Sequence, residues 1–206
     1  FTSNVTLIEL SNINNPLLRE LAEKAPGTFQ HSMQVSTLAS EAATRIKANS
    51  QLVRTAALYH DIGKMDNAPF FTENQNKVNP HDKLTPQESA AIIVGHVEKG
   101  IALADKFGLP ESIKGFIASH HGKGVARYFY IKYAQDHPDS APDPLDFSYP
   151  GPNPYSKETA ILMMADAVEA ASRSLKEYTE DSIAELVDKI IDNQVSEGYF
   201  MDCPIN

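Results

Sequence analysis

The segment Tyr59-His60-Asp61-Ile62-Gly63-Lys64 places an imidazole directly beside a carboxylate. These two neighbours offer one neutral nitrogen ligand and one charged oxygen ligand, and a carboxylate can bridge two cations. Other residues of ligand type stand elsewhere in the chain: His31, His96, the doublet His120-His121 and Asp166. Five imidazoles and two carboxylates are about what two octahedral metals need, with positions left for water and substrate. This set predicts a metallohydrolase.

Asp166 is informative because of its surroundings. It lies in an apolar run over residues 161–168, and burying an aspartate there is unfavourable unless something neutralises it. A salt bridge or a helix N-terminus is the alternative to a metal. The doublet His120-His121 fits best at a helix end, where Gly122 permits a turn, because adjacent side chains on a helix diverge by about 100°.

Apolar residues recur at helical spacing nearly throughout, and the sequence therefore predicts an all-α fold. Helix starts are indicated by Asn15-Pro16, by Ser50, by Thr85 with Glu88 in a capping box, and by Ser156. The first predicted helix begins after Asn15 and ends before Pro26. The others span 28–46, 50–63, 85–107, 110–122, 125–136, 156–176 and 180–194. The candidate ligands lie on five of these helices or at their ends.

Two segments have no periodicity. Residues 63–84 contain Pro69, Pro80 and several asparagines, and long loops inside compact domains are often functional, so we expect a substrate loop. Six prolines fall within residues 138–154, which predicts an irregular proline-rich loop over 138–155. With no internal repeat and no other linker, residues 1–206 are expected to form one domain.

Composition limits the possible functions. The net charge of −9 argues against binding long nucleic acid, although it does not exclude a small phosphorylated ligand held near cations. No stretch approaches the roughly 20 apolar residues of a membrane span. The single cysteine, Cys203, cannot form an internal disulfide, which suggests a reducing compartment. Because the chain lacks an initial Met, we expect a piece of a longer protein.

The ordered series His, His-Asp, His, His-His, Asp across about 135 residues resembles the HD-domain phosphohydrolase superfamily. Further motifs resemble the cytosolic HD domain of the seven-transmembrane HD family, whose members are bacterial cyclic-di-AMP phosphodiesterases producing linear pApA. These motifs are HDIGK over 60–64, Pro69-Phe70-Phe71, Glu73-Asn74-Gln75, Asn79-Pro80-His81-Asp82, Ala25-Pro26-Gly27-Thr28 and Ala170-Ala171-Ser172-Arg173-Ser174-Leu175. The HD-GYP relatives act on cyclic-di-GMP and expect Glu where Gly122 stands, and their Gly-Tyr-Pro is absent.

The resemblance implies an HD-domain helical bundle with a dinuclear metal site. One metal would be held by His31, His60, Asp61 and Asp166, and Asp61 would bridge to a second metal completed by His96, His120 and His121. Imidazole-rich ligands without cysteine suit iron or manganese. The full-length protein is expected to be membrane-anchored with this part at the cytoplasmic face, and its oligomeric state is not indicated.

The expected reaction is attack of a metal-bridging hydroxide on phosphorus, with Asp61 and Lys64 as catalytic residues. Lys64 is placed to face the phosphate or the leaving oxygen, or else it is a solvated lysine at a helix end. Phe70, Phe71, Asn74 and Gln75 are candidates for an adenine pocket, although the two phenylalanines would equally form a small core. His81 and Arg173 are further candidate substrate contacts; a surface histidine and an ion-paired arginine are the alternatives.

Two other functions stay open from the sequence. The first is another enzyme, either an HD nucleotidase acting on mononucleotides or a mixed-valent di-iron oxygenase with similar ligands. The second is a regulatory module that binds a cyclic dinucleotide without cleaving it. Comparing cyclic-di-AMP with mononucleotides and polyols as substrates would separate the enzymes, and binding without a pApA product would favour the module.

Overall fold

The structure, a computed structural model, describes residues 2–204 and is helical, as the periodicity predicts. Within these residues no β-strand occurs, and one isolated bridge pairs Val125 with Ser148. The helices are α1 (Asn4–Leu10), α2 (Pro16–Lys24), α3 (Pro26–Arg45), α4 (Ser50–Tyr59), α5 (Pro86–Lys106), α6 (Glu111–Ser119), α7 (Arg127–Asp136), α8 (Lys157–Ser172) and α9 (Glu180–Ser196). No helix in the described part is both long and apolar enough to cross a membrane.

Most helix starts follow the predicted caps. The Asn15 side chain accepts a hydrogen bond from the Leu17 amide, and both halves of the Thr85–Glu88 capping box are formed. The cap of α4 was predicted at Ser50 and is instead Asn49, whose side chain accepts from the Leu52 amide. Helix α3 begins two residues before the predicted Thr28, because Pro26 suits the first helical turn, and α8 ends at Ser172 rather than near residue 176.

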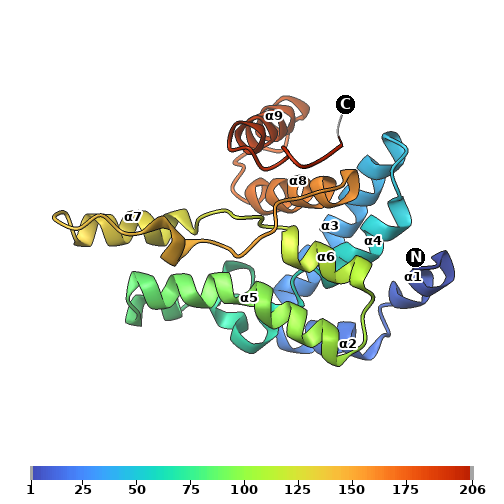
Figure 1. Cartoon of the computed structure of the whole chain (residues 1–206), viewed down its shortest axis with the longest axis horizontal. Helices are drawn as coiled ribbons and strands as arrows, with labels where there is room; N and C mark the ends of the chain where they lie inside the picture. Colours follow the sequence, from blue (N-terminus) through green and yellow to red (C-terminus); the bar gives the residue numbers. More distant parts are fainter. Residues whose placement is uncertain (1, 205–206) are drawn as a thin grey trace.

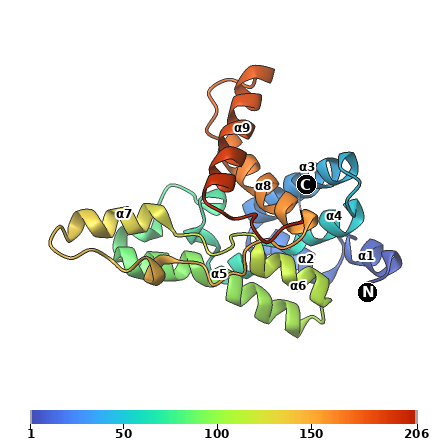
Figure 2. The ribbon, with the colours of Figure 1, turned by 45° about the horizontal axis from the view of Figure 1, so that its top comes forward.

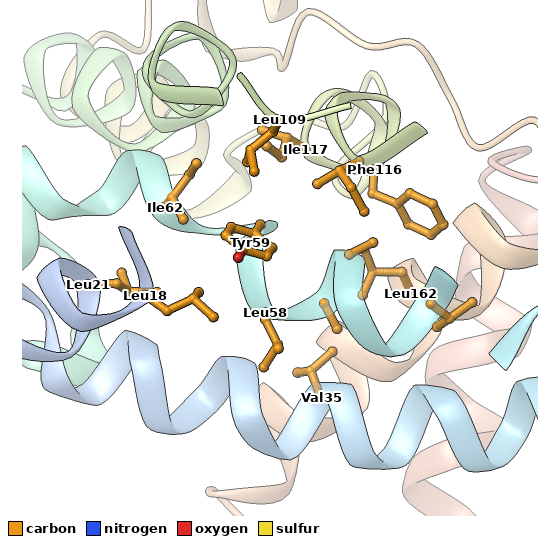
Figure 3. Packing of buried hydrophobic residues seen from close by; sticks show 14 of the residues in the cluster. Leu18, Leu21, Val35, Leu58, Tyr59, Ile62, Leu109, Phe116, Ile117 and Leu162 are labelled. Atoms are coloured by element: carbon orange, nitrogen blue, oxygen red, sulfur yellow. The ribbon is translucent and has the colours of Figure 1, made fainter. Parts of the chain in front are cut away.

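The hydrophobic core lies where α3, α4, α6 and α8 meet (Figure 3). Tyr59 is fully buried in this core, and its hydroxyl donates to the carbonyl of Leu10 at 2.5 Å. Leu58, Tyr59 and Ile62 pack into the same cluster on either side of His60 and Asp61. Core packing therefore fixes the backbone on both sides of the His-Asp pair.

A glycine brings this segment against α5. A Cβ placed on Gly63 would lie 1.8 Å from the carbonyl oxygen of His96, which no side chain permits. Only glycine allows so close an approach of two backbones. The distance between Asp61 and His96 therefore depends on Gly63.

The predicted substrate loop is more regular than its sequence indicates. Residues 62–83 contain three 3-10 helices, at Ile62–Phe70, Thr72–Asn74 and Pro80–Lys83. Asn67 interrupts the first of them with non-helical backbone angles, and Pro69 lies inside it. Short 3-10 turns do not produce the periodicity that reveals an α-helix, which explains the difference.

The proline-rich segment is largely irregular, as predicted, apart from one 3-10 turn at Pro144–Phe147. Together with α7 it forms an arm that extends away from the body of the molecule and returns towards its centre (Figure 1). On the way back, the amide of Ala126 donates to Phe147 and the amide of Tyr149 donates to Gly124, both at 2.8 Å. Helix α9 packs along α8 on another side of the molecule (Figure 2).

Candidate metal centre

The structure brings together all seven sequence-predicted ligand residues, which come from five helices or from the residues that directly follow them. His31 lies in α3, His96 in α5 and Asp166 in α8, whereas His60-Asp61 and His120-His121 directly follow α4 and α6. Six of the seven are buried, and His121 is partly exposed. Gly122, three residues beyond the end of α6, adopts a left-handed conformation with φ of +54°, and both imidazoles of the doublet face the centre.

The ligand atoms form two groups that share Asp61, each with all atoms within 4.8 Å of one another. The groups are His31, His60, Asp61 and Asp166, and Asp61, His96, His120 and His121. Asp61 divides its two oxygens between them. Its Oδ2 faces Nε2 of His60 at 3.3 Å and Nε2 of His31 at 3.7 Å, and its Oδ1 lies 3.3 Å from Nε2 of both His96 and His120.

These separations suit shared cations. Two ligand atoms bound at right angles to one cation, each about 2.1 Å from it, lie roughly 3 Å apart. Nε2 of His31 is 2.7 Å from Oδ1 of Asp166, and Nε2 of His60 is 3.4 Å from the same oxygen. In the other group, the Nε2 atoms of His96 and His120 are 3.2 Å apart.

Backbone carbonyls determine which imidazole nitrogen faces the centre. Nδ1 of His60, His96 and His120 lies 2.6 to 2.8 Å from the carbonyl oxygen of the residue three positions earlier. A carbonyl only accepts, so Nδ1 carries the proton and Nε2 of the neutral ring presents a lone pair. The lone pairs of His96 and His120 then face each other and repel unless a cation lies between them.

Two buried atoms without hydrogen-bond partners also indicate a metal centre. Nε2 of His60 and Oδ1 of Asp61 are buried and have no hydrogen-bond partner. Buried polar groups are nearly always satisfied, and exceptions require an explanation. Together with the donor set, these atoms indicate a centre able to bind metal ions.

Charge is unevenly distributed across the centre in the metal-free protein. Burial opposes the charged imidazoles, but hydrogen bonds to Asp166 and Glu169 raise the pKa of His31 to about 9. The negative charges of Asp61 and Asp166 raise the pKa of His60 to about 10. Burial lowers the pKa of His121, and neighbouring imidazoles lower it further. Although burial favours neutral carboxyls, Lys64 and His60 hold the pKa of Asp61 well below its usual range.

Lys64 is not the solvated lysine that the sequence left open. Its ammonium lies 2.8 Å from Oδ2 of Asp61 and 2.9 Å from Oε1 of Glu73, and 12% of the side chain is exposed. Burial opposes its charge, but these two carboxylates raise its pKa, so the side chain stays cationic. It therefore presents a fixed positive charge beside the centre.

Two residues of the site were missed by the sequence analysis. The Glu169 carboxylate accepts a hydrogen bond from Nδ1 of His31 and pairs with Arg173, whose Nη2 lies 2.5 Å from Oε2. The Tyr149 ring stacks on His121, with centroids 4.3 Å apart and planes at 20°. The spacing of three residues from Asp166 would have placed Glu169 on the same helix face, whereas nothing local indicates Tyr149.

A cavity of about 1160 Å³ opens onto the centre. Five of the candidate substrate contacts line it, and so do Lys64 and Tyr149. These five candidates are Phe70, Phe71, Gln75, His81 and Arg173. Phe71 is buried and its ring packs edge-to-face with that of His96. Phe70 is half-buried and contacts His81, and the adenine pocket stays a prediction for both residues. Arg173 pairs with Glu169, as one of the two alternatives for this residue predicts. It also lines the cavity.

Asn74 does not line this cavity. Its Oδ1 accepts from the amide of Thr28 at 3.0 Å, and its Nδ2 donates to Oγ1 of Thr28 at 2.8 Å. The amide thus satisfies the first turn of α3, where peptide N–H groups lack partners. The sequence made Asn74 a candidate for an adenine pocket, whereas in the structure its side chain caps the first turn of α3.

The helical fold and the clustered ligands define a class of protein, and residues 28–171 match the HD domain family. The chain belongs to this family, as its ordered ligands predicted. It is similar to the cyclic-di-AMP phosphodiesterase PgpH of Listeria monocytogenes, with 44% identity over 97% of this chain and 28% of that protein. The Bacillus subtilis protein of the same name is 40% identical, over 98% of this chain and 28% of its own length. The chain thus spans less than a third of these relatives.

A solved structure is also similar. The HD domain of the Listeria monocytogenes phosphodiesterase PgpH, in complex with cyclic-di-AMP, superimposes with a TM-score of 0.88 and is 43% identical. The match covers 93% of this chain and 88% of that one. At this identity and coverage, the family assignment extends over almost the whole fold.

Proposed function

We propose that this protein hydrolyses a cyclic dinucleotide, with cyclic-di-AMP as the preferred substrate and linear pApA as the product. The observation that carries the proposal is the shared carboxylate of Asp61, which turns one oxygen towards each of two ligand groups at the floor of a large cavity. The similarity to a domain described in complex with cyclic-di-AMP supports the choice of substrate.

The ligand groups would hold two divalent cations, iron or manganese, with His31, His60 and Asp166 on one side of Asp61 and His96, His120 and His121 on the other. Two such cations lower the pKa of a bound water and stabilise the attacking and leaving oxygens of a phosphoryl transfer. Because the imidazole Nδ1 atoms of His60, His96 and His120 donate hydrogen bonds to backbone carbonyls, Nε2 of each ring already faces the site of the cations before any cation binds.

The remaining side chains of the cavity would bind and orient the substrate. Lys64 supplies a buried positive charge next to the centre, suited to a phosphoryl oxygen or to the charge that develops on the leaving ribose oxygen. Phe70 and Tyr128 offer aromatic surface for a base, because stacking is the usual way in which proteins hold unpaired bases. Arg173 and Gln75 also line the cavity and can donate hydrogen bonds.

The test is a product assay on metal-loaded protein. Manganese- and iron-loaded samples are incubated with cyclic-di-AMP, cyclic-di-GMP, a deoxynucleoside monophosphate and a polyol, and the products are separated by chromatography. We expect pApA to form fastest, and Asp61→Ala to abolish turnover and lower the metal content. Binding of cyclic-di-AMP without any product would favour the regulatory module, and turnover of the monophosphate alone would favour a nucleotidase.

A further inference from the structure

His121 differs from the other four imidazoles of the centre. Nδ1 donates a hydrogen bond to a backbone carbonyl in His60, His96 and His120, and to the Glu169 carboxylate in His31. Within residues 2–204, neither nitrogen of His121 has a hydrogen bond. A ligating histidine almost always donates its other N–H to a partner that fixes the ring, so this ring must be held in another way.

The backbone around His121 is hydrogen-bonded, but it does not by itself orient the imidazole ring. The residue lies beyond the end of α6, between His120 and Gly122, and Gly124 follows three positions later. Gly122 is in a left-handed conformation. Side chains next to such a turn are free to rotate unless packing prevents it.

Three aromatic rings pack against His121. Those of His120 and His96 are tilted to it by 47° and 86°, and the ring that stacks on it is that of Tyr149. Its ring lies nearly parallel to the His121 ring, at 20° with centroids 4.3 Å apart, and its centroid is 6.0 Å from that of His96. Tyr149 is itself anchored by its backbone, since its amide donates to Gly124 and the bridge between Val125 and Ser148 precedes it. The returning proline-rich segment is therefore tied to the same turn that carries His121.

We propose that Tyr149 is a positioning residue that orients His121 for metal binding by stacking on its ring, in place of the hydrogen bond that orients the other four imidazoles. This inference rests on the proposed dinuclear site. It assigns a function to the proline-rich segment, whose returning end carries Tyr149 to the centre. The flat face of the ring, rather than the hydroxyl, is the part that acts.

The experiment titrates metal-free protein with Mn²⁺ and measures stoichiometry and Kd for wild type, Tyr149→Phe and Tyr149→Leu. We expect Tyr149→Phe to match wild type within about twofold, because the stack remains. Tyr149→Leu should weaken one of the two sites by about 10- to 100-fold, the usual effect of losing a group that orients a ligand. Loss of affinity in Tyr149→Phe, or wild-type affinity in Tyr149→Leu, would overturn the proposal.

A matched control is available in the same chain. Tyr133 stacks on His137 with nearly the same geometry, 4.2 Å and 17°, on the exposed end of α7. Tyr133→Leu removes a similar stack away from the centre, and we expect it to bind Mn²⁺ as wild type does. Circular dichroism shows whether each variant is folded, and a loss of Mn²⁺ affinity in Tyr149→Phe overturns the proposal even if Tyr149→Leu does not fold.

A double-mutant cycle tests whether the effect passes through His121. In a His121→Ala background the stack has no partner, so Tyr149→Leu should cause no further loss of Mn²⁺ affinity. An equal loss with and without His121 would show that Tyr149 acts by another route and would refute the proposal. Failure of the wild type to bind a second Mn²⁺ would instead refute the dinuclear site, so the two failures are distinguishable.

Discussion

Glu169 accepts a hydrogen bond from Nδ1 of His31, although the two residues are 138 positions apart in the sequence. Because a carboxylate only accepts, this contact places a proton on Nδ1 and directs Nε2 to the centre, 2.7 Å from Asp166. One face of α8 thus supplies both a ligand and the group that orients a ligand of α3. Arg173, one turn further along, balances the charge of Glu169.

The four residues His31, His60, Asp61 and Asp166 are called the His31 group. We expect Glu169→Ala to weaken metal binding at this group by about 10- to 100-fold, because the His31 imidazole loses the acceptor that fixes its tautomer. Glu169→Gln should have a smaller effect, since the amide oxygen still accepts from Nδ1. Metal content after dialysis, measured by elemental analysis, checks both variants. Glu185→Gln, on the exposed face of α9, is the control. Wild-type metal content in Glu169→Ala would contradict the orienting role.

Lys64→Met should lower kcat by about 10²- to 10³-fold, the usual effect of removing one stabilising donor. Metal content should be retained, because no metal ligand is lost. Single-turnover measurement of pApA formation, paired with elemental analysis, separates the two effects. Lys83→Met, at an exposed position, serves as the control. If Lys64→Met lost its metals instead, Lys64 would act mainly by holding Asp61 in place.

Metal binding should release protons at neutral pH. Metal-free His31 and His60, with pKa values of about 9 and 10, carry protons below those values, and a protonated Nε2 cannot ligate a metal. The pKa values of His120 and His121 are lowered, chiefly by burial, so these rings are already neutral. The metal affinity of the His31 group should therefore rise with pH up to about 9 to 10. The other group, Asp61 with His96, His120 and His121 (the His121 group), should bind metal at lower pH.

Calorimetric titrations in two buffers with different ionisation enthalpies count these protons. At pH 7, binding to the His31 group should release protons, and binding to the His121 group should release fewer. Metal uptake that releases no protons at this pH would show that both groups are deprotonated in the metal-free protein.

Asn74 and Gln75 are adjacent, but their substitutions should have different effects. Asn74→Ala removes the acceptor for the Thr28 amide and should lower the free energy of unfolding by about 1 kcal/mol, with KM nearly unchanged. Gln75→Ala, at the cavity wall, should raise KM with little change in stability. Urea denaturation and initial-rate kinetics measure the two quantities. The reverse pattern would restore Asn74 as a substrate contact.

Local signals in the sequence were sufficient for most of the helices. The apolar period and the caps at Asn15, Thr85 and Ser156 act within about four residues, so they can be recognised without the fold. They were insufficient between residues 62 and 83, where 3-10 turns leave no clear period. The cap of α4 was misplaced for another reason: Asn49 and Ser50 are neighbours, and both residue types are good helix caps.

The sequence by itself determined the all-α class and, through its ordered His and Asp residues, the family and the set of candidate ligands. Tertiary structure decided which oxygen of Asp61 faces which group, that Lys64 is buried between two carboxylates, and that Glu169 and Tyr149 orient His31 and His121. These relations join residues far apart in the chain. They depend on how helices pack and on close approaches such as Gly63 against His96, and periodicity and capping carry no information about either.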